Sequence, residues 1–271
     1  IPNWKEQDQD TIAGYVNDIA EEMQDYLNDF YDILSTKVLN VDKDKHRLEI
    51  KKEYVAKAGL WVAKKRYAQW IISDNGVPVD KLDVKGLDVK RSSFPKAFQE
   101  CMGTVLIDIL KGKSETEISD YVLDFKKNMI NRPTVEIAKN SAVKNLKKYM
   151  PKGKGKRERF SIMKGTPAHV KAAILYNDCL KHFNAPFKYE PLKSGDKVKW
   201  VYLKDNPLGI DGLAFTGYKD PPEIEEFLAT YIDHNKIFER ELGHKLQVFY
   251  DAIGWGDIIS EQRTAEKFFN F

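Results

Sequence analysis

A change in the period of the apolar residues constrains the fold more than any other feature of this chain. From residue 12 to 38, apolar side chains recur every three or four positions, which places them on one face of an α-helix. Asp10 and Thr11 are suited to cap the start of this helix. After this helix the sequence becomes rich in β-branched and aromatic residues, and it is interrupted by Gly59 and by a turn signal at residues 74–76. The pattern predicts a long helix followed by two or three antiparallel strands.

The second half of the chain returns to helical patterns. Residues 92–112 combine a serine cap with a proline in the first turn and a glycine stop. A second helix is predicted at 114–129, where acids come early and lysines late, and a third at 167–182. Residues 196–215 alternate around an Asn-Pro-Leu-Gly turn, which is typical of a strand pair. A long helix is then predicted from 222 to 252. The expected fold class is α+β: a small antiparallel sheet with a long helix, then a mainly helical region with a β-hairpin.

The net charge of +3 conceals a strong segregation of charge along the chain. Nine acids and one lysine lie between residues 1 and 35, whereas ten bases and one acid lie between 139 and 164. This distribution predicts one strongly positive surface, which is typical of proteins that bind polyanions. Residues 150–160 contain repeated glycines and are expected to form a flexible basic loop. The alternative is a loop whose lysines are simply solvated.

Composition and short motifs exclude several classes of protein. No apolar run approaches the roughly 18 residues of a membrane span, so we expect a soluble protein without a membrane partner. Cys101 and Cys179 lie far apart and lack partners at metal-ligand spacing, which favours a reducing cytoplasm. The five histidines form no zinc motif, and nucleophile-elbow and nucleotide-binding signatures are missing. We therefore predict no metal site, no cofactor and no catalytic residue in this chain.

Two pairs of carboxylates could in principle hold Mg²⁺. Asp8 and Asp10 form one pair, and Asp42 and Asp44 form the other. A catalytic pair needs apolar flanks that fix it beneath the substrate, whereas both pairs lie in polar sequence. Capping or solvated-turn roles are therefore expected for these four residues.

The segment GLWVAKKRYAQWII places Lys64, Lys65, Arg66 and Tyr67 in a predicted strand. A period of two would put Lys65 and Tyr67 on one face and the other two side chains on the opposite face. Cations on both faces of a strand are unusual, and the alternative is an exposed edge strand protected by lysines. The segment resembles the KKRY motif of family B DNA polymerases, most closely that of the T-even phage replicative polymerases.

The resemblance extends over roughly residues 50–271 in the order of the family. It continues through the segments VKGLDVKRSSFPKAFQECMGTVLIDILKG, TPAHVKAAILYN, VYLKDNPLGIDGLAF, YIDHNKIFERELGHKLQVFYDAIGW and AEKFFNF. It implies that residues 1–91 are the C-terminal part of the palm and that 92–258 are the thumb, which binds the DNA duplex. Residues 259–271 would be a flexible tail that binds the sliding clamp.

The resemblance also implies roles for individual residues. Lys65 and Tyr67 would lie in the minor groove at the primer terminus, where each base pair presents an acceptor. The implied DNA-binding residues are Lys64, Lys65, Arg66, Tyr67, Lys164, His169, Lys171, Tyr176 and Asn206. The implied clamp-binding residues are Phe268, Phe269 and Phe271. Lys171 and Ala172 stand where the family usually has Arg-Gly, so a charge is kept but a guanidinium fork is lost.

The catalytic motifs of the family are nowhere in the chain, and residues 1–48 match it poorly. We therefore expect a fragment or a split subunit of a phage polymerase that is inactive alone, with Mg²⁺ serving the complete enzyme. Its partners would be primer–template DNA, the sliding clamp and the remainder of the polymerase, in the cytoplasm of the bacterial host. The alternatives are a stand-alone nucleic-acid-binding module, possibly for RNA, and an unrelated helical interaction protein.

Overall fold

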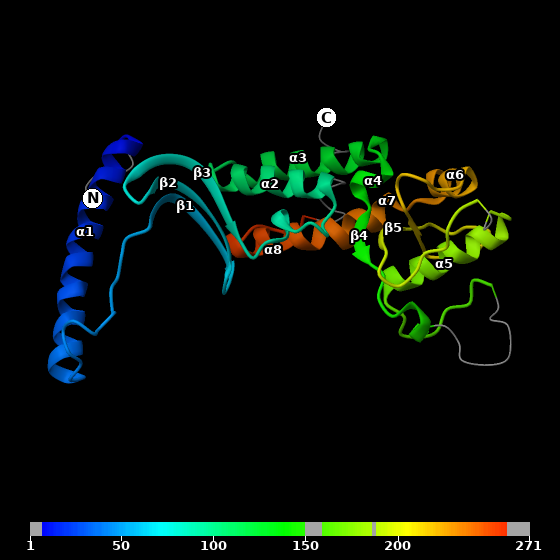
Figure 1. Ribbon diagram of the computed structural model, residues 1–271. Helices are drawn as coiled ribbons and strands as arrows, with labels where there is room; N and C mark the ends of the chain where they lie inside the picture. Colours follow the sequence, from blue (N-terminus) through cyan, green and yellow to red (C-terminus); the bar gives the residue numbers. More distant parts are fainter. Residues whose placement is uncertain (1–6, 150–158, 186–187, 259–271) are drawn as a thin grey trace, which may run out of the picture. The chain divides into compact units, whose positions relative to one another are not determined.

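The computed structural model describes residues 7–149, 159–185 and 188–258. They form two compact units that divide between Gly86 and Leu87, with the short segment Leu110–Gly112 belonging to the first unit. Within the described residues, each unit contains one three-stranded antiparallel sheet together with helices (Figure 1). The expected α+β class is therefore confirmed.

The first unit consists of one long helix and one sheet. Helix α1 covers Gln9–Ile33 and continues into a π-helical turn at Leu34–Val38. The strands are β1 (Tyr54–Ala63), β2 (Arg66–Asp74) and β3 (Val77–Lys85), which pair in the order β1-β2-β3. The predicted helix and strands are all present in this order.

The start of α1 differs in detail from the prediction. The N-cap is Asp8 and not Asp10 or Thr11. The Asp8 carboxylate accepts hydrogen bonds from the backbone N–H of Thr11 at 2.9 Å and from its hydroxyl at 2.6 Å. These bonds lower the pKa of Asp8, the side-chain bond having the larger effect. The capping role expected for the Asp8 carboxylate is thus confirmed.

The turn between β2 and β3 lies where the sequence predicts it, but Gly59 does not break the sheet. Asn75 and Gly76 both have positive φ, as a tight hairpin turn requires. Gly59 instead lies inside β1, and a Cβ at this position would collide with the ring of Trp61. Glycine therefore allows the indole to cross the strand, so its role is close packing and not chain reversal.

The second unit begins with helices that their local signals predict well. Helix α2 covers Lys96–Leu110, and α3 covers Glu115–Asn128. Ser114 and Glu117 form a complete capping box at the start of α3. Helix α5 covers Ala168–His182, within one residue of its predicted start.

The sheet of the second unit contains a strand that the sequence does not predict. Strands β5 (Lys197–Tyr202) and β6 (Gly212–Phe215) form the predicted hairpin. Strand β4 (Lys139–Ala142), which follows the short helix α4 (Thr134–Ile137), adds to β5 in antiparallel register. The sheet order is β4-β5-β6.

The helix predicted from 222 to 252 is divided in two by a strand-like contact. Helix α6 covers Pro222–Tyr231, and after it Ile232 forms an isolated β-bridge with Leu203. Asp233 then caps α7, since its carboxylate accepts from the Lys236 N–H at 2.9 Å. Three elements follow without a gap, namely α7 (His234–Ile237), a π-helical segment (Phe238–Gly243) and α8 (His244–Ile253).

Aromatic side chains fill much of the core of the second unit. Tyr250 is fully buried and its hydroxyl lies 3.1 Å from that of Ser119, so the buried polar atom is satisfied. Burial raises the pKa of the Cys101 and Cys179 thiols to about 12, so both are protonated and unreactive at neutral pH.

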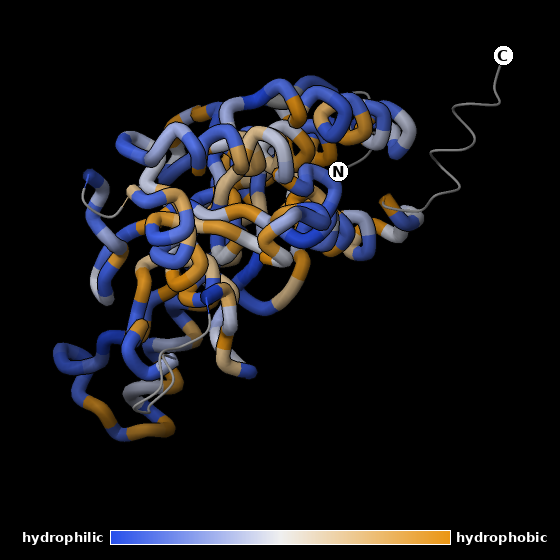
Figure 2. The backbone as a smooth tube through the Cα atoms, turned by 90° about the vertical axis from the view of Figure 1, so that its right-hand side faces the viewer, coloured by the Kyte–Doolittle hydropathy of each residue, from blue (hydrophilic) through white to orange (hydrophobic). Residues whose placement is uncertain are grey.

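Hydrophobic and hydrophilic segments alternate along the helices, as amphipathic packing requires (Figure 2). None of the helices in the described ranges combines the length and the apolar character needed to span a membrane.

Candidate nucleic-acid interface

Lys64 and Lys65 form the tip of the hairpin between β1 and β2. Ala63 pairs with Arg66 across the hairpin, so only the two lysines lie between the strands. Lys65 has a φ of 61°, in the left-handed region that reverses the chain. The prediction that residues 64–67 lie within one strand was therefore wrong for the two lysines, while Arg66 and Tyr67 begin β2.

The hairpin tip presents three successive cations to solvent. Lys64, Lys65 and Arg66 are exposed, and Tyr67 is half-buried. No acidic residue of the described chain pairs with any of the three cations. Tyr67 lies opposite Trp61 on one neighbouring strand and opposite Lys85 on the other. The tip therefore concentrates positive charge at the end of the antiparallel hairpin formed by β1 and β2.

Gly86 fixes the position of this tip from the end of β3. Its φ is 65°, and a Cβ at this residue would overlap the carbonyl oxygen of Lys65. Only glycine allows so close an approach between the two backbone segments. The hairpin tip thus depends on a residue 21 positions further along the chain.

A small basic cavity surrounds Lys171 in the second unit. Its volume is about 190 Å³, and its lining includes Lys171, Lys236 and Arg240. The Lys171 ammonium lies 2.7 Å from the Asp211 carboxylate, and the Lys236 ammonium lies 5.5 Å from the centre of the Tyr202 ring. Three cations against one carboxylate make the cavity suited to an anion such as a phosphate.

His169 lies on the same helix as Lys171, two residues before it. It is half-buried, and burial lowers its pKa, with the nearby Lys139 charge lowering it further. The imidazole is therefore neutral at pH 7, so it can donate or accept a hydrogen bond but adds no positive charge.

Tyr176 occupies a different environment from the one its predicted role requires. Its side chain is 1% exposed, and the phenol lies near the Asp220 carboxylate. Burial raises the pKa of Tyr176, and the negative charge of Asp220 raises it further. Such a side chain offers no surface for direct contact with DNA, and the structure gives it a supporting position in the core.

The side chain of Asn206 forms hydrogen bonds with the backbone around it. Its amide donates to the carbonyls of Lys204 and Ile210, and its oxygen accepts from the N–H groups of Leu208 and Ile210. These bonds hold the turn between β5 and β6 in one conformation. The side chain thereby shapes the turn, with its polar groups already engaged.

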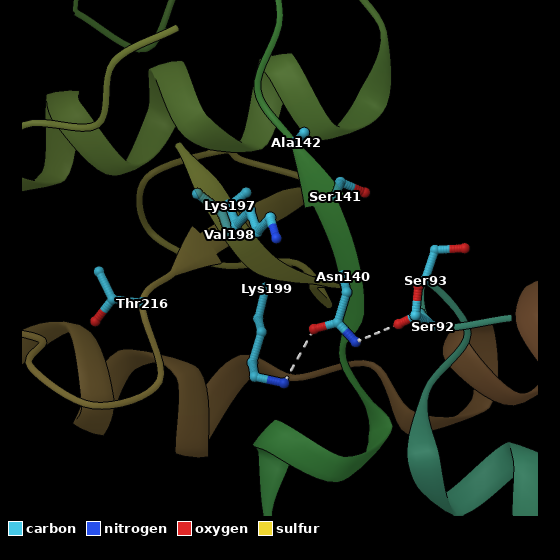
Figure 3. A pocket seen from close by; sticks show the side chains of 9 residues that line it. All are labelled: Ser92, Ser93, Asn140, Ser141, Ala142, Lys197, Val198, Lys199 and Thr216. Carbon is cyan, nitrogen blue, oxygen red and sulfur yellow. Dashed lines mark hydrogen bonds between the residues drawn. The ribbon is translucent and has the colours of Figure 1, made fainter. Parts of the chain in front are cut away.

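A groove of about 440 Å³ runs beside β4 and β5, lined by residues from four segments (Figure 3). The residues that line it are Ser92, Ser93, Asn140, Ser141, Ala142, Lys197, Val198, Lys199 and Thr216. The lining contains two lysines and no carboxylate. Lys199 is held in place, since its ammonium donates to the Asn140 side chain at 3.0 Å and to the Val135 carbonyl at 3.1 Å. Such a lining of lysines, hydroxyls and one amide can accept a phosphodiester.

Of the remaining predicted site residues, the structure describes only Lys164. Lys164 is exposed before the start of α5. The predicted clamp-binding residues Phe268, Phe269 and Phe271 and most of the basic loop at 150–160 lie outside the described residues. In the described ranges, no group of three or more His, Cys, Asp or Glu residues could hold a metal ion.

Several of the groove and cavity residues did not figure in the sequence-based interpretation. Lys236 and Arg240 are four residues apart on successive helical segments, a spacing that places them on one face. Lys197 and Lys199 alternate along β5, which likewise places them on one face of the strand. Both spacings were visible in the sequence, but their proximity to β4 and α5 was not.

Comparisons with known proteins place the chain in a family. The sequence model described as DNA polymerase family B matches residues 22–252. The DNA-directed DNA polymerase of Enterobacteria phage T4 is 26% identical over 200 residues, which cover 72% of this chain and 21% of that protein. The corresponding enzyme of Escherichia phage RB69 is 28% identical over 200 residues, with the same coverage. The chain thus spans 21% of the length of the curated relatives it matches. Since the family match covers most of its residues, this chain belongs to DNA polymerase family B.

Proposed function

We propose that this chain is the part of a phage replicative DNA polymerase that holds primer–template DNA. The first unit would be a portion of the palm, and the second would be the thumb, with the boundary near residues 86–91. The observation that carries the proposal is the exposed tip of Lys64, Lys65 and Arg66 in a chain of this family. The metal-binding carboxylates, and the Mg²⁺ they hold, would belong to the rest of the polymerase.

The hairpin tip has the chemistry needed to test the primer terminus. In the minor groove every base pair presents an acceptor at purine N3 or pyrimidine O2. A lysine ammonium donates to either acceptor, so Lys65 would sense the shape of a base pair without reading its sequence. Lys64 and Arg66, on either side of it, would neutralise backbone phosphates.

The second unit offers two further places for the sugar–phosphate backbone. The groove beside β4 and β5 supplies hydroxyls and two lysines, and the cavity at Lys171 supplies three cations. Contacts of this kind position the duplex and carry no base specificity. Tyr176 and Asn206 would contribute by keeping the surrounding backbone rigid.

Binding of duplex DNA to the isolated chain tests this function. We expect weak binding with little sequence preference, in which log K falls with log salt by about 0.9 for each phosphate neutralised. Fluorescence anisotropy with two duplexes of equal length and unrelated sequence, between low and moderate salt, gives both quantities. An affinity that does not change with salt, or that differs strongly between the two duplexes, would contradict the proposal.

We also propose that the tail, residues 259–271, docks on a sliding clamp through Phe268, Phe269 and Phe271. Three aromatic residues close an otherwise polar segment, and aromatic side chains commonly anchor a peptide to a partner. Tethering would raise processivity through effective concentration. Deletion of Lys267, Phe268, Phe269, Asn270 and Phe271 should abolish stimulation of the assembled polymerase by its clamp, with clamp-independent extension unchanged. Equal stimulation of truncated and intact enzyme would refute the docking role.

A further inference from the structure

Helix α1 carries a stripe of large apolar side chains that the described residues leave exposed. The stripe consists of Tyr15, Ile19, Met23, Tyr26, Phe30 and Ile33, which are 49, 51, 58, 74, 49 and 51% exposed. At about 100° per residue, these six positions fall within about 80° of one another around the helix axis. They therefore form one continuous face along most of the helix.

The other sides of α1 are already accounted for. One side holds the segment that leads into β1, where the Asn28 side chain bonds to both backbone groups of Ile50 and Gln24 accepts from the Lys52 N–H. The adjoining arc of the helix carries acids and no base of its own. These acids are Asp10, Asp18, Glu21, Glu22, Asp25, Asp29 and Asp32. Around the helix axis these acids lie between that segment and the apolar stripe, so the stripe faces away from the segment.

The size of the stripe points to a protein partner. Large side chains present roughly 150–250 Å² each, so half exposure of six gives an apolar surface on the order of 500 Å². Contiguous apolar patches of this size, rimmed by polar groups, usually mark an interaction site. Scattered exposed apolar residues, such as Tyr218 in the second unit, carry no such meaning.

The charge beside the stripe argues against a second copy of this chain as the partner. Helix α1 carries seven acids and no base of its own, and Lys52 and Lys43 from the following segment pair with only Glu21 and Asp32 among the described contacts. Two copies of α1 packed side by side would therefore still bring like charges together. A partner with an apolar face and basic residues at its rim would fit both the stripe and the adjacent acids, in particular Glu22 and Asp29.

We propose that the apolar stripe of α1 is the docking surface for the catalytic part of the polymerase. This proposal rests on the proposed function, because the partner is defined as the polypeptide that carries the family's metal-binding carboxylates. Two observations support the choice of partner. The family match begins at residue 22, inside α1, so this helix is an element of the family. The chain spans only 21% of the length of its relatives, so most of such a polymerase is available to cover the stripe.

The test compares two matched tyrosine substitutions. Tyr26→Glu places a charge at the most exposed point of the stripe, and Tyr218→Glu makes the same change at an exposed tyrosine of the second unit. The probe is the polypeptide of the same genome that carries the catalytic carboxylates, expressed without residues 1–271. Titration calorimetry should show binding to the unaltered chain, weakening of at least tenfold by Tyr26→Glu, and a change below twofold for Tyr218→Glu.

The outcomes separate this proposal from the proposed function. Equal affinity of Tyr26→Glu and the unaltered chain, or no binding to either, would overturn the docking surface. A dimer of the chain alone that Tyr26→Glu dissociates would overturn it in favour of a second copy. The affinity for DNA is measured in parallel and should be the same for the unaltered chain and for Tyr26→Glu. Loss of salt-dependent DNA binding together with intact docking would refute only the DNA-holding function.

Discussion

Replacing Lys65 by glutamate should lower the affinity of the chain for primer–template DNA by about 10- to 100-fold at low ionic strength. Lys65 stands exposed at the hairpin tip between Lys64 and Arg66, so the substitution reverses the central charge of three. No acidic residue among those described pairs with it, so the whole charge is available to the ligand. Anisotropy at several salt concentrations should also show a shallower salt slope for the variant.

Two further variants separate the charge of Lys65 from its backbone conformation. Lys65→Asn removes the charge, but asparagine tolerates the positive φ of this position, so it should lose about tenfold in affinity with an unchanged unfolding midpoint. Lys37→Glu makes the same charge change elsewhere in the first unit and should leave the affinity within about twofold. If Lys37→Glu and Lys65→Glu weakened binding equally, the effect would be one of net charge, and the tip would have no special role.

Extension by the assembled polymerase is the functional counterpart of this experiment. A lysine at the primer terminus should affect incorporation at every position of the template, because its contacts do not depend on sequence. Lys65→Glu should therefore reduce extension rates across templates of different composition. Normal extension by the variant would contradict a position at the primer terminus.

The helices of this chain could be predicted from sequence because their determinants are local. The capping box of Ser114 and Glu117 lies within one turn of α3, and the spacing of apolar residues in α1 extends over the whole helix. The break after Tyr231 could not be predicted in this way. It depends on Ile232 pairing with Leu203, a residue 29 positions earlier in the chain. Tertiary contact here overrides a continuous helical pattern.

The hairpin tip was hidden for a similar reason. The sequence around Lys64 and Lys65 contains none of the residues that usually mark a two-residue turn, so it reads as uninterrupted strand. The turn is set by strand register and by the close approach of Gly86 to Lys65. Recognition of the KKRY motif identified the residues of interest, whereas their conformation required the fold.

The groove of the second unit shows the same limit. Strand β4 is four residues long and its sequence, Lys-Asn-Ser-Ala, has no strand pattern of its own. It becomes a strand only through pairing with β5, which brings Asn140 to Lys199. Residues that are 59 positions apart thus form one polar lining that no local signal indicates.

Asp220→Ala should destabilise the second unit by about 3 kcal/mol, since three donors lose a charged acceptor, and this is a large share of the stability of a typical domain. The Asp220 carboxylate is buried and accepts from the Thr216 N–H at 2.9 Å, the Thr216 hydroxyl at 2.9 Å and the Gly217 N–H at 2.8 Å. The phenol of Tyr176, whose pKa is raised mainly by burial, lies close enough for the Asp220 charge to raise that pKa further. Alanine would leave all three donors without this acceptor, in a place where water can replace it only in part.

The effect of Asp220 should extend to the groove, because Thr216 is one of its lining residues. Urea unfolding followed by aromatic fluorescence measures the stability, with Glu226→Ala as the control, since that carboxylate lies on the exposed face of α6. The control should change the free energy of unfolding by less than about 0.5 kcal/mol. The free energy of unfolding of Asp220→Asn should lie between those of the unaltered chain and Asp220→Ala. The amide oxygen can still accept a hydrogen bond, whereas the NH₂ group would face other donors. The free energies of unfolding of Asp220→Ala and Glu226→Ala could instead differ by less than about 0.5 kcal/mol. In that case the buried carboxylate does not stabilise the loop from Thr216 to Asp220, and the sheet alone determines the shape of the groove.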